Sequence, residues 1–285
     1  MVKRKLGRLN RSGGGDFGVN LVLVLFGLFM VLPLVYAVCS AFKPMDEIFL
    51  YPPRFFVRNP TLTNFQDLFV IMGKSWVPFS RYVFNSVFIT VAGTAGHVLV
   101  GSMAAYVLAK YEFKGADTIS KLVVTAMMFS GYVTAIPNYL VISKLGWVDT
   151  YWAIIIPAFA SPMGLFLMRQ FMEGVPNAII EAAKIDGAGE FRIYWQIIMP
   201  MIKPAWLTAI IFSIQALWNN RASTFIYSED LKTLPYALQQ IINGGVARQG
   251  VGSAVTLFMM IVPITVFVLA QSNIIETMAT SGIKD

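Results

Sequence analysis

The chain has 285 residues, of which 56% are hydrophobic and only 13% are charged, and its mean hydropathy is +0.65. A soluble domain averages about 25% charged residues, so this composition excludes a water-soluble globular enzyme, a disordered tail and a nucleic-acid-binding domain. The net charge of +7 then indicates basic loops beside a membrane. The single cysteine, Cys39, excludes an internal disulfide, and the single histidine, His97, argues against a histidine-based metal site. We therefore expect a multispanning membrane protein without a metal centre.

Stretches without Asp, Glu, Lys or Arg mark the expected spans, because a helix needs about 20 residues to cross the hydrocarbon core. None of these stretches shows the alternation of a β-strand. Six are long and apolar enough to count: residues 17–42, 82–109, 122–143, 150–168, 204–220 and 249–275. The sequence thus predicts an all-α integral membrane protein with six transmembrane helices. It is organised as a short segment 1–16 and a transmembrane domain 17–285.

Basic residues ahead of the first window set the expected orientation. They are Lys3, Arg4, Lys5, Arg8 and Arg11. Positive charge marks the cytoplasmic side of a span, and six spans then place both termini in the cytoplasm. In this topology the loops 43–81 and 221–248 lie outside, and residues 169–203 form the longest cytoplasmic loop.

The second window carries small residues at every fourth position, which places them on one helix face. The small residues are Gly93, Gly101, Ala105 and Ala109, and His97 lies on the same face. Such a face favours close packing of helices. His97 is interpreted first as a packing residue, and its alternative role is a proton relay or metal ligand.

The loop 169–203 has the pattern of a helix, a turn and a second helix. Pro176 suits a helix start and Gly187 a helix stop, and the second helix runs from near Glu190 to Pro200. We expect Gly187 to permit a sharp turn at a point where a side chain would clash. The small and apolar residues on the first helix predict a protein partner on this side of the membrane.

A longer motif in the same loop resembles a known family. It consists of Glu181-Ala182-Ala183-x-x-Asp186-Gly187-Ala188, Tyr194-Trp195, Ile197-x-Met199-Pro200 and Pro204. It resembles the EAA loop of bacterial ABC-importer permeases, and most of all the smaller permease subunit of carbohydrate importers of the maltose/maltodextrin type. The resemblance covers essentially the whole chain, including Asn64-Phe65 and Asn85-Ser86.

The resemblance implies a coupling helix that docks into a cleft of a separate ATP-hydrolysing subunit. The residues that would couple to this ATPase are Glu181, Ala182, Ala183, Asp186, Gly187, Ala188 and Pro200. The implied partners are a second homologous permease subunit, two ATPase subunits and an extracytoplasmic solute-binding protein, assembled in the bacterial plasma (inner) membrane. The chain would move an oligosaccharide by alternating access, and its tail 281–285 would touch the ATPases. It would be no enzyme and hold no cofactor of its own, since the partner subunits bind ATP and Mg²⁺.

A sugar pathway calls for aromatic faces together with amide or hydroxyl groups, because sugars present both C–H faces and OH groups. Candidates within the spans are Tyr132, Asn138, Tyr139, Gln215, Trp218 and Asn219. Each of them also fits helix packing or an interfacial belt, and the partner permease is an alternative source of substrate contacts.

Three other functions stay open from the sequence. They are an ion-coupled secondary transporter, an ABC permease for a peptide, amino acid or phosphate ester, and a membrane scaffold or intramembrane enzyme. Ion carriers usually hold charged residues within their spans. The six windows offer only His97, which favours an ATP-driven partner as the energy source.

Overall fold

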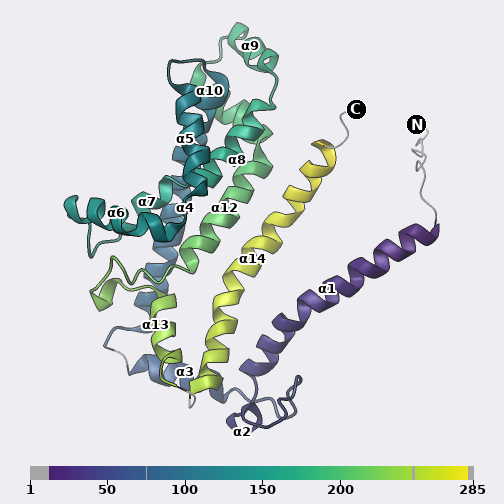
Figure 1. Cartoon of the computed structure of the whole chain (residues 1–285), viewed down its shortest axis with the longest axis vertical. Helices are drawn as coiled ribbons and strands as arrows, with labels where there is room; N and C mark the ends of the chain where they lie inside the picture. The colour runs from purple at the N-terminus through teal and green to yellow at the C-terminus, as the bar shows by residue number, and fades with distance from the viewer. Residues whose placement is uncertain (1–12, 75, 246–247, 282–285) are drawn as a thin grey trace. The chain divides into compact units, whose positions relative to one another are not determined.

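The computed structural model describes the backbone of residues 13–74, 76–245 and 248–281, and every regular element among them is helical (Figure 1). The all-α prediction is therefore confirmed. The basic residues before position 13 and the tail 282–285 lie outside the described residues. The chain divides into two compact units, residues 1–68 with 245–257 and residues 69–244 with 258–285.

The first unit contains the N-terminal helix and the loop that follows it. Its elements are α1 (Gly13–Ala41), α2 (Met45–Ile48), the start of α3 (Thr63–Gly73) and the start of α14 (Gln249–Ser281). Asn64 closes the end of α1, because its buried side-chain amide donates to the carbonyl oxygens of Ala41 (2.9 Å) and Lys43 (2.7 Å). This contact gives Asn64, noted in the sequence, a structural role.

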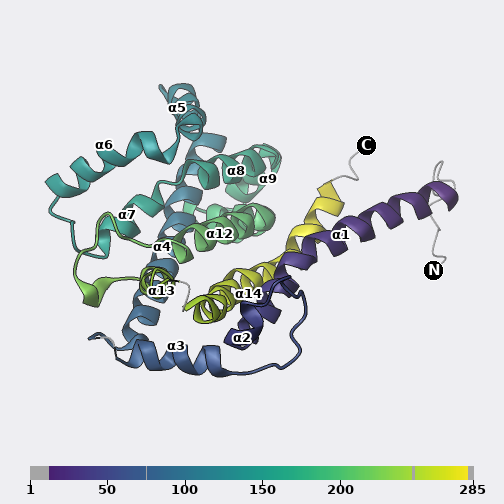
Figure 2. The same cartoon turned by 60° about the horizontal axis from the view of Figure 1, so that its bottom comes forward.

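The second unit is built around one long helix, α4 (Phe79–Lys110). The unit also contains the end of α3 and the larger part of α14. The other helices are α5 (Ala116–Met128), α6 (Gly131–Lys144), α7 (Trp152–Phe159), α8 (Pro162–Glu173), α9 (Asn177–Ile185), α10 (Glu190–Ile193), the π-helical turn η1 (Tyr194–Ile198), α11 (Met199–Met201), α12 (Lys203–Trp218), the 3₁₀ turn η2 (Glu229–Leu231) and α13 (Leu234–Ile242). The long helix α4 packs against α7, α8 and α12 (Figure 2).

Small residues on α4 and α8 allow this close approach. A Cβ added to Gly96 would lie 1.9 Å from the ring of Phe159, and one added to Gly164 would lie 2.0 Å from Nε2 of His97. His97 is only 1% exposed, and its Nδ1 lies 3.3 Å from the carbonyl oxygen of Phe159. Its surroundings are those of a packing residue, and no cluster of three metal-binding side chains occurs among the described residues.

Two of the expected spans are strongly bent. Four helices or helix runs are long and apolar enough to cross a membrane: Phe17–Ala41, Phe79–Lys110, Trp152–Glu173 and Gln249–Gln271. The described residues reach six spans when the bent pairs Ala116–Met128 with Gly131–Lys144 (113°) and Glu190–Met201 with Lys203–Trp218 (80°) each count as one.

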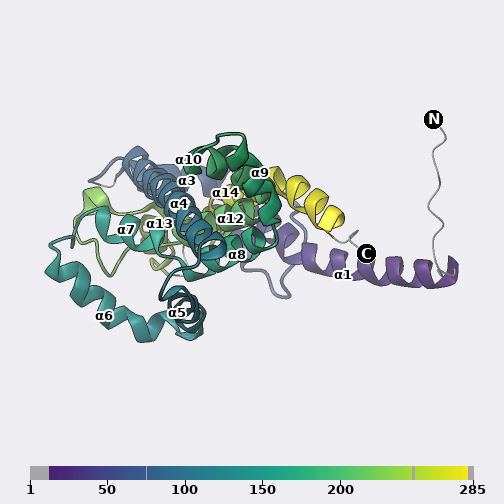
Figure 3. The ribbon, with the colours of Figure 1, turned by 90° about the horizontal axis from the view of Figure 1, so that it is seen from above.

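The window 122–143 is therefore not one straight helix (Figure 3). Ser130 adopts an extended backbone, and its hydroxyl accepts the N–H of Tyr132, so a new helix begins there. A second break lies within the window 150–168, where α7 ends at Phe159 and Pro162 opens α8. Proline suits the first turn of a helix because it has no N–H to be satisfied.

Candidate functional site

The turn between α9 and α10 has the backbone geometry of a helix stop. Gly187 has φ +78°. Its N–H donates to the carbonyl of Lys184 (3.0 Å), and the N–H of Ala188 donates to the carbonyl of Ala183 (2.9 Å). This pair of hydrogen bonds is a Schellman motif, which glycine favours because positive φ strains residues with a Cβ.

The expectation that a side chain at position 187 would clash is wrong for this chain. A Cβ added at this position would meet no atom of the chain within 4 Å. The glycine is required by its backbone angle, and the space around it within this chain is open. A side chain at position 187 would therefore point away from the rest of the chain.

The helix α9 has one buried and one exposed face. Ile180 and Ala183 are buried in a cluster with residues of α4, α8 and η1. On the opposite side Glu181, Ala182 and Ile185 are exposed, and Ile185 is 85% exposed. We name the surface formed by Ala178, Glu181, Ala182 and Ile185 the outer face of α9.

The remaining coupling candidates lie at the ends of this loop. Asp186 is the exposed C-cap of α9, and Ala188 packs partly buried against the core cluster. Pro200 is exposed in α11, immediately before the 80° bend into α12. The structure thus brings six of the seven candidates together around the α9 turn and leaves Pro200 apart in α11.

A polar clamp joins this turn to the end of α4. Nζ of Lys184 lies 2.8 Å from Oε1 of Glu190. Oε2 of Glu190 accepts hydrogen bonds from the hydroxyls of Tyr106 (3.1 Å) and Tyr111. The hydrogen bond to Glu190 raises the pKa of Lys184 above its ordinary value. Sequence analysis missed this role of Glu190, because its tyrosine partners are 84 and 79 positions away.

Two further contacts fix the same end of α4. Nζ of Lys110 donates to the carbonyl of Val175 (2.5 Å) and to Oδ1 of Asn177 (3.0 Å), at the start of α9. The hydroxyls of Ser102 and Tyr194 are 2.6 Å apart. The segment 175–194 is thus attached to α4 on both sides of the turn.

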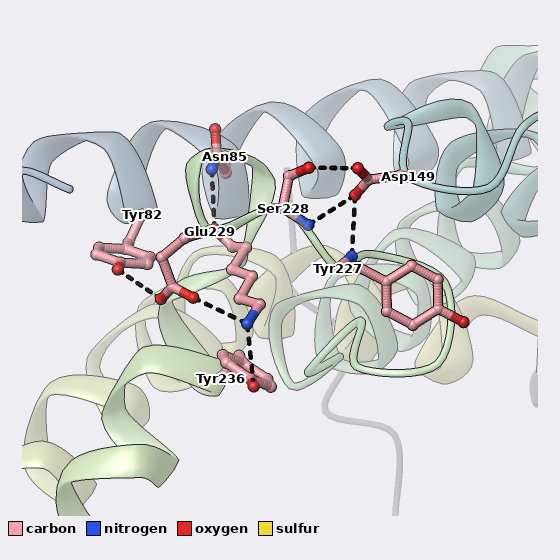
Figure 4. Close-up of polar contacts among 8 residues, drawn as sticks. Tyr82, Asn85, Asp149, Tyr227, Ser228, Glu229 and Tyr236 are labelled. Carbon is pink, nitrogen blue, oxygen red and sulfur yellow. Dashed lines mark hydrogen bonds and ion pairs between the residues drawn. The ribbon is translucent and has the colours of Figure 1, made fainter. Parts of the chain in front are cut away.

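The other end of α4 is tied to the loop that precedes α13 (Figure 4). The side-chain amide of Asn85 donates to the carbonyls of Asp230 and Lys232, both at 2.8 Å. The hydroxyl of Tyr82 donates to Glu229 (2.8 Å), which also pairs with Lys232 (2.8 Å). One continuous helix therefore links the α9 turn with this second loop.

Asp149 anchors the same loop from the segment between α6 and α7. Its Oδ1 accepts the backbone N–H groups of Tyr227 (2.9 Å) and Ser228 (2.8 Å), and its Oδ2 accepts the Ser228 hydroxyl (Figure 4). These hydrogen bonds, led by that of the Ser228 hydroxyl, lower the pKa of Asp149. This anchor was not predicted, because Asp149 and its partners are 78 and 79 positions apart in the sequence.

Comparison with known proteins decides the family. The model of the family "binding-protein-dependent transport system inner membrane component" matches residues 97–279, which include the whole α9 turn. The chain belongs to this family. It is thus a multi-pass inner membrane component of an ABC transport system and a transport subunit.

Several relatives of this inner membrane component match over most of their length. Protein LplC of Bacillus subtilis is 34% identical over 82% of this chain and 77% of its own. The polygalacturonan/rhamnogalacturonan transport system permease YtcP of the same organism is 31% identical over 81% of both chains. The arabinooligosaccharide permease AraQ of Halalkalibacterium halodurans is 30% identical over 89% of this chain and 91% of its own.

A solved structure shares the fold. A chain of a bacterial ABC transporter that imports the acidic polysaccharide alginate matches with a TM-score of 0.76 at 22% identity, over 93% of this chain and 99% of the other. A second alginate transporter structure, in complex with a pentasaccharide-bound periplasmic protein, gives a TM-score of 0.61 at 13% identity, over 90% and 93% of the two chains. Both confirm the fold of the transport component.

The six candidates for sugar contact do not form one group in this transport subunit. Tyr132 and Asn138 are exposed on α6. Tyr139 lies on the same helix, with its hydroxyl 3.3 Å from that of Tyr227 and its ring stacked on Phe225.

The other three lie where α12 ends. Gln215 and Asn219 are exposed, and the Asn219 amide donates to the Gln215 carbonyl (2.8 Å). Trp218 is buried, and its indole N–H donates to the carbonyl of Met259 in α14 (3.1 Å). Trp218 therefore packs helices together, while the pathway role of all six stays a prediction.

Proposed function

We propose that this chain is a permease subunit of an ATP-driven importer for an oligosaccharide. In this proposal it pairs with a second homologous permease, and two ATPase subunits bind ATP and Mg²⁺ and supply the energy. An extracytoplasmic solute-binding protein delivers the sugar to the loops 43–81 and 221–248. Both termini and α9 lie in the cytoplasm.

The observation that carries the proposal is the combination of an exposed outer face on α9 with a clamp to α4. An exposed isoleucine among small residues suits a close protein contact. The clamp makes α9 and α4 move together, so a displacement of α9 by an ATPase is passed to the spans as a rigid-body motion. ATP binding would then favour one of two arrangements of the bundle, as alternating access requires.

The relatives support a sugar as the transported solute. Their names describe permeases for arabinooligosaccharides, polygalacturonan and rhamnogalacturonan, diacetylchitobiose and galactooligosaccharides. The solved neighbours are transporters of alginate, which is also a polysaccharide. An oligosaccharide is the substrate class common to these proteins.

A pull-down from the native host tests the ATPase partnership. The tagged wild-type chain is compared with Ala182→Trp, which adds bulk to the outer face of α9, and with Ala182→Ser, which stays small. We expect an ATPase subunit to co-purify with the wild type and with Ala182→Ser, and to be lost from Ala182→Trp. The second permease should stay bound in all three samples, which shows that the variants fold.

Two results would contradict the proposal. If the ATPase remains fully bound to Ala182→Trp, its docking surface lies elsewhere than on the outer face of α9. The absence of any ATPase from a wild-type complex that survives the detergent would remove the ATP-driven mechanism itself.

A further inference from the structure

A cavity of about 420 Å³ opens beside the break between α7 and α8. This volume lies within the range of about 300–1,000 Å³ that is usual for small-molecule sites. Its walls come from α4, α7, α8, α12 and the loop after α12, and none of the six predicted sugar-contacting residues lines it. We propose that this cavity is a subsite for a neutral oligosaccharide, so that this chain itself contacts the sugar. The inference rests on the proposed function.

Polar side chains with free hydrogen-bonding capacity line the cavity. The hydroxyl of Ser161 has no hydrogen-bond partner among the residues that the structure describes, and that of Ser213 shares one bond with Thr94 (3.0 Å). Oδ1 of Asn220 accepts the N–H of Ala222 (2.8 Å). That bond leaves the amide hydrogens of Asn220 unpaired within the described part of the chain. These groups can exchange hydrogen bonds with sugar hydroxyls.

The break in the span adds backbone donors to the same wall. The first N–H groups of a helix have no acceptor within it, and Met163 and Gly164 occupy this position at the start of α8 and line the cavity. Irregular backbone at membrane depth is tolerated where it lines a hydrated cavity. Transporters place substrate sites at interrupted helices for the same reason.

The remaining walls suit the C–H faces of a sugar and disfavour an anion. The aromatic residues Phe212 and Phe225 line the cavity together with aliphatic residues such as Ile154 and Leu217. All lining residues other than His97 are of uncharged types, and Nδ1 of His97 already contacts a carbonyl. A carboxylate would lose its water here without a lysine or arginine to replace it, at a high free-energy cost. We therefore assign the cavity to neutral sugars and exclude uronates.

Thiol labelling tests occupancy directly, because Cys39 is the sole cysteine. Ser213→Cys is made in a Cys39→Ser background, and the intact complex with its binding protein is treated with a small thiol reagent. The matched control is Thr208→Cys, also on α12, where the native hydroxyl bonds its own helix and lies outside the cavity. The probes are arabinotriose, galactotriose and diacetylchitobiose as neutral sugars, and trigalacturonate as the anionic sugar.

We expect a neutral sugar that the wild type imports to slow labelling at position 213. At ten times its dissociation constant, the sugar should slow the reaction roughly tenfold. Labelling at position 208 should not change, and trigalacturonate should protect neither position. Protection by trigalacturonate would overturn the assignment to neutral sugars.

Uptake into proteoliposomes provides the second measurement. Ala216→Phe, which fills the cavity, should reduce uptake of the neutral sugar roughly tenfold while the ATPase subunits stay bound. Ile214→Phe, on α12 but outside the cavity, should transport like the wild type. The cavity site would be overturned if the wild type imports the sugar, the sugar does not protect position 213, and Ala216→Phe transports normally. The proposed function would then remain intact. A wild-type complex that imports none of the sugars would overturn both the cavity site and the proposed function.

Discussion

Lys184 and Glu190 lie on opposite sides of the turn at Gly187, and their side chains form an ion pair with 2.8 Å between Nζ and Oε1. The two side chains are 47% and 52% exposed, so water screens the pair and it contributes little to stability by itself. Its importance is geometric, because the second oxygen of Glu190 binds Tyr106 and Tyr111. One carboxylate thus connects α9 with the end of α4.

Glu190→Gln should weaken the transmission of motion without unfolding the chain. The amide oxygen can still accept a tyrosine hydrogen bond, but the charge that holds Lys184 is lost. Less sugar should therefore be transported per ATP hydrolysed than in the wild type, because α9 and α4 are less firmly joined. Sugar uptake and ATP hydrolysis are measured together in proteoliposomes.

Glu173→Gln is the matched control for this variant. Its carboxylate pairs with Arg169 (2.7 Å) on the same helix, α8, and does not belong to the clamp. Transport per ATP should therefore stay at the wild-type value. An equal loss in both variants would show that the clamp has no special role.

Gly187→Ala and Gly189→Ala should differ, although the two glycines are only two positions apart. Neither Cβ would meet another atom within 4 Å. Gly187 has φ +78° whereas Gly189 has φ −72°, so only the first substitution strains the backbone, by about 1–2 kcal/mol. Hydrogen exchange of the α9 amides should accelerate in Gly187→Ala and stay unchanged in Gly189→Ala. Similar exchange in both would contradict the role given to the positive φ.

Gly164→Ala should destabilise the second unit, and His97→Ala should relieve that effect. The added Cβ would lie 2.0 Å from Nε2 of His97, and such overpacking costs about 1–3 kcal/mol. Removal of the imidazole frees the space, so the double variant should be more stable than the sum of the single effects predicts. Thermal unfolding of all four proteins measures this coupling. Strict additivity would argue against direct packing of the two residues.

The same variants bear on the ion-coupled alternative. If His97 acts through packing alone, the His97→Ala protein that remains folded should still transport sugar with ATP. Loss of transport together with a normal unfolding temperature would instead show that His97 does more than pack, either as a proton relay or as part of the cavity wall.

Local signals made the α9 turn predictable from the sequence. Pro176 and Gly187 lie next to the helix that they delimit, and the structure has α9 between them. The clamp could not be predicted, because Glu190 finds Tyr106 and Tyr111 only after α4 packs against the loop. Helix ends depend on neighbouring residues, whereas side-chain partners depend on the tertiary fold.

The membrane spans also have some features that the sequence predicts and others that depend on the tertiary fold. A count of uncharged residues finds the apolar segments but does not by itself detect a bend within one, whereas Pro162 inside the window 150–168 predicts the break at which α8 begins. The break at Ser130 depends on a single hydroxyl that caps a new helix. The cavity cannot be predicted in this way, because Ser161 and Ser213 come from different windows and line one cavity only in the packed bundle.

Asp149→Asn should lower stability at neutral pH and lose this effect in acid. The native carboxylate accepts hydrogen bonds from Tyr227 and Ser228, which lower its pKa. A depressed pKa means that Asp149 contributes stability above its unfolded pKa of about 3.9, and that this contribution disappears as the pH falls through the folded pKa. Asparagine tolerates the native φ of +61°, so the variant removes the charge without straining the backbone. The expected loss of stability is about 1 kcal/mol or less, because the loop is exposed. The difference in unfolding temperature between wild type and variant, followed from pH 7 to about pH 3, should therefore shrink towards zero. A difference that is constant over this range would mean that the loop is not held by the carboxylate charge.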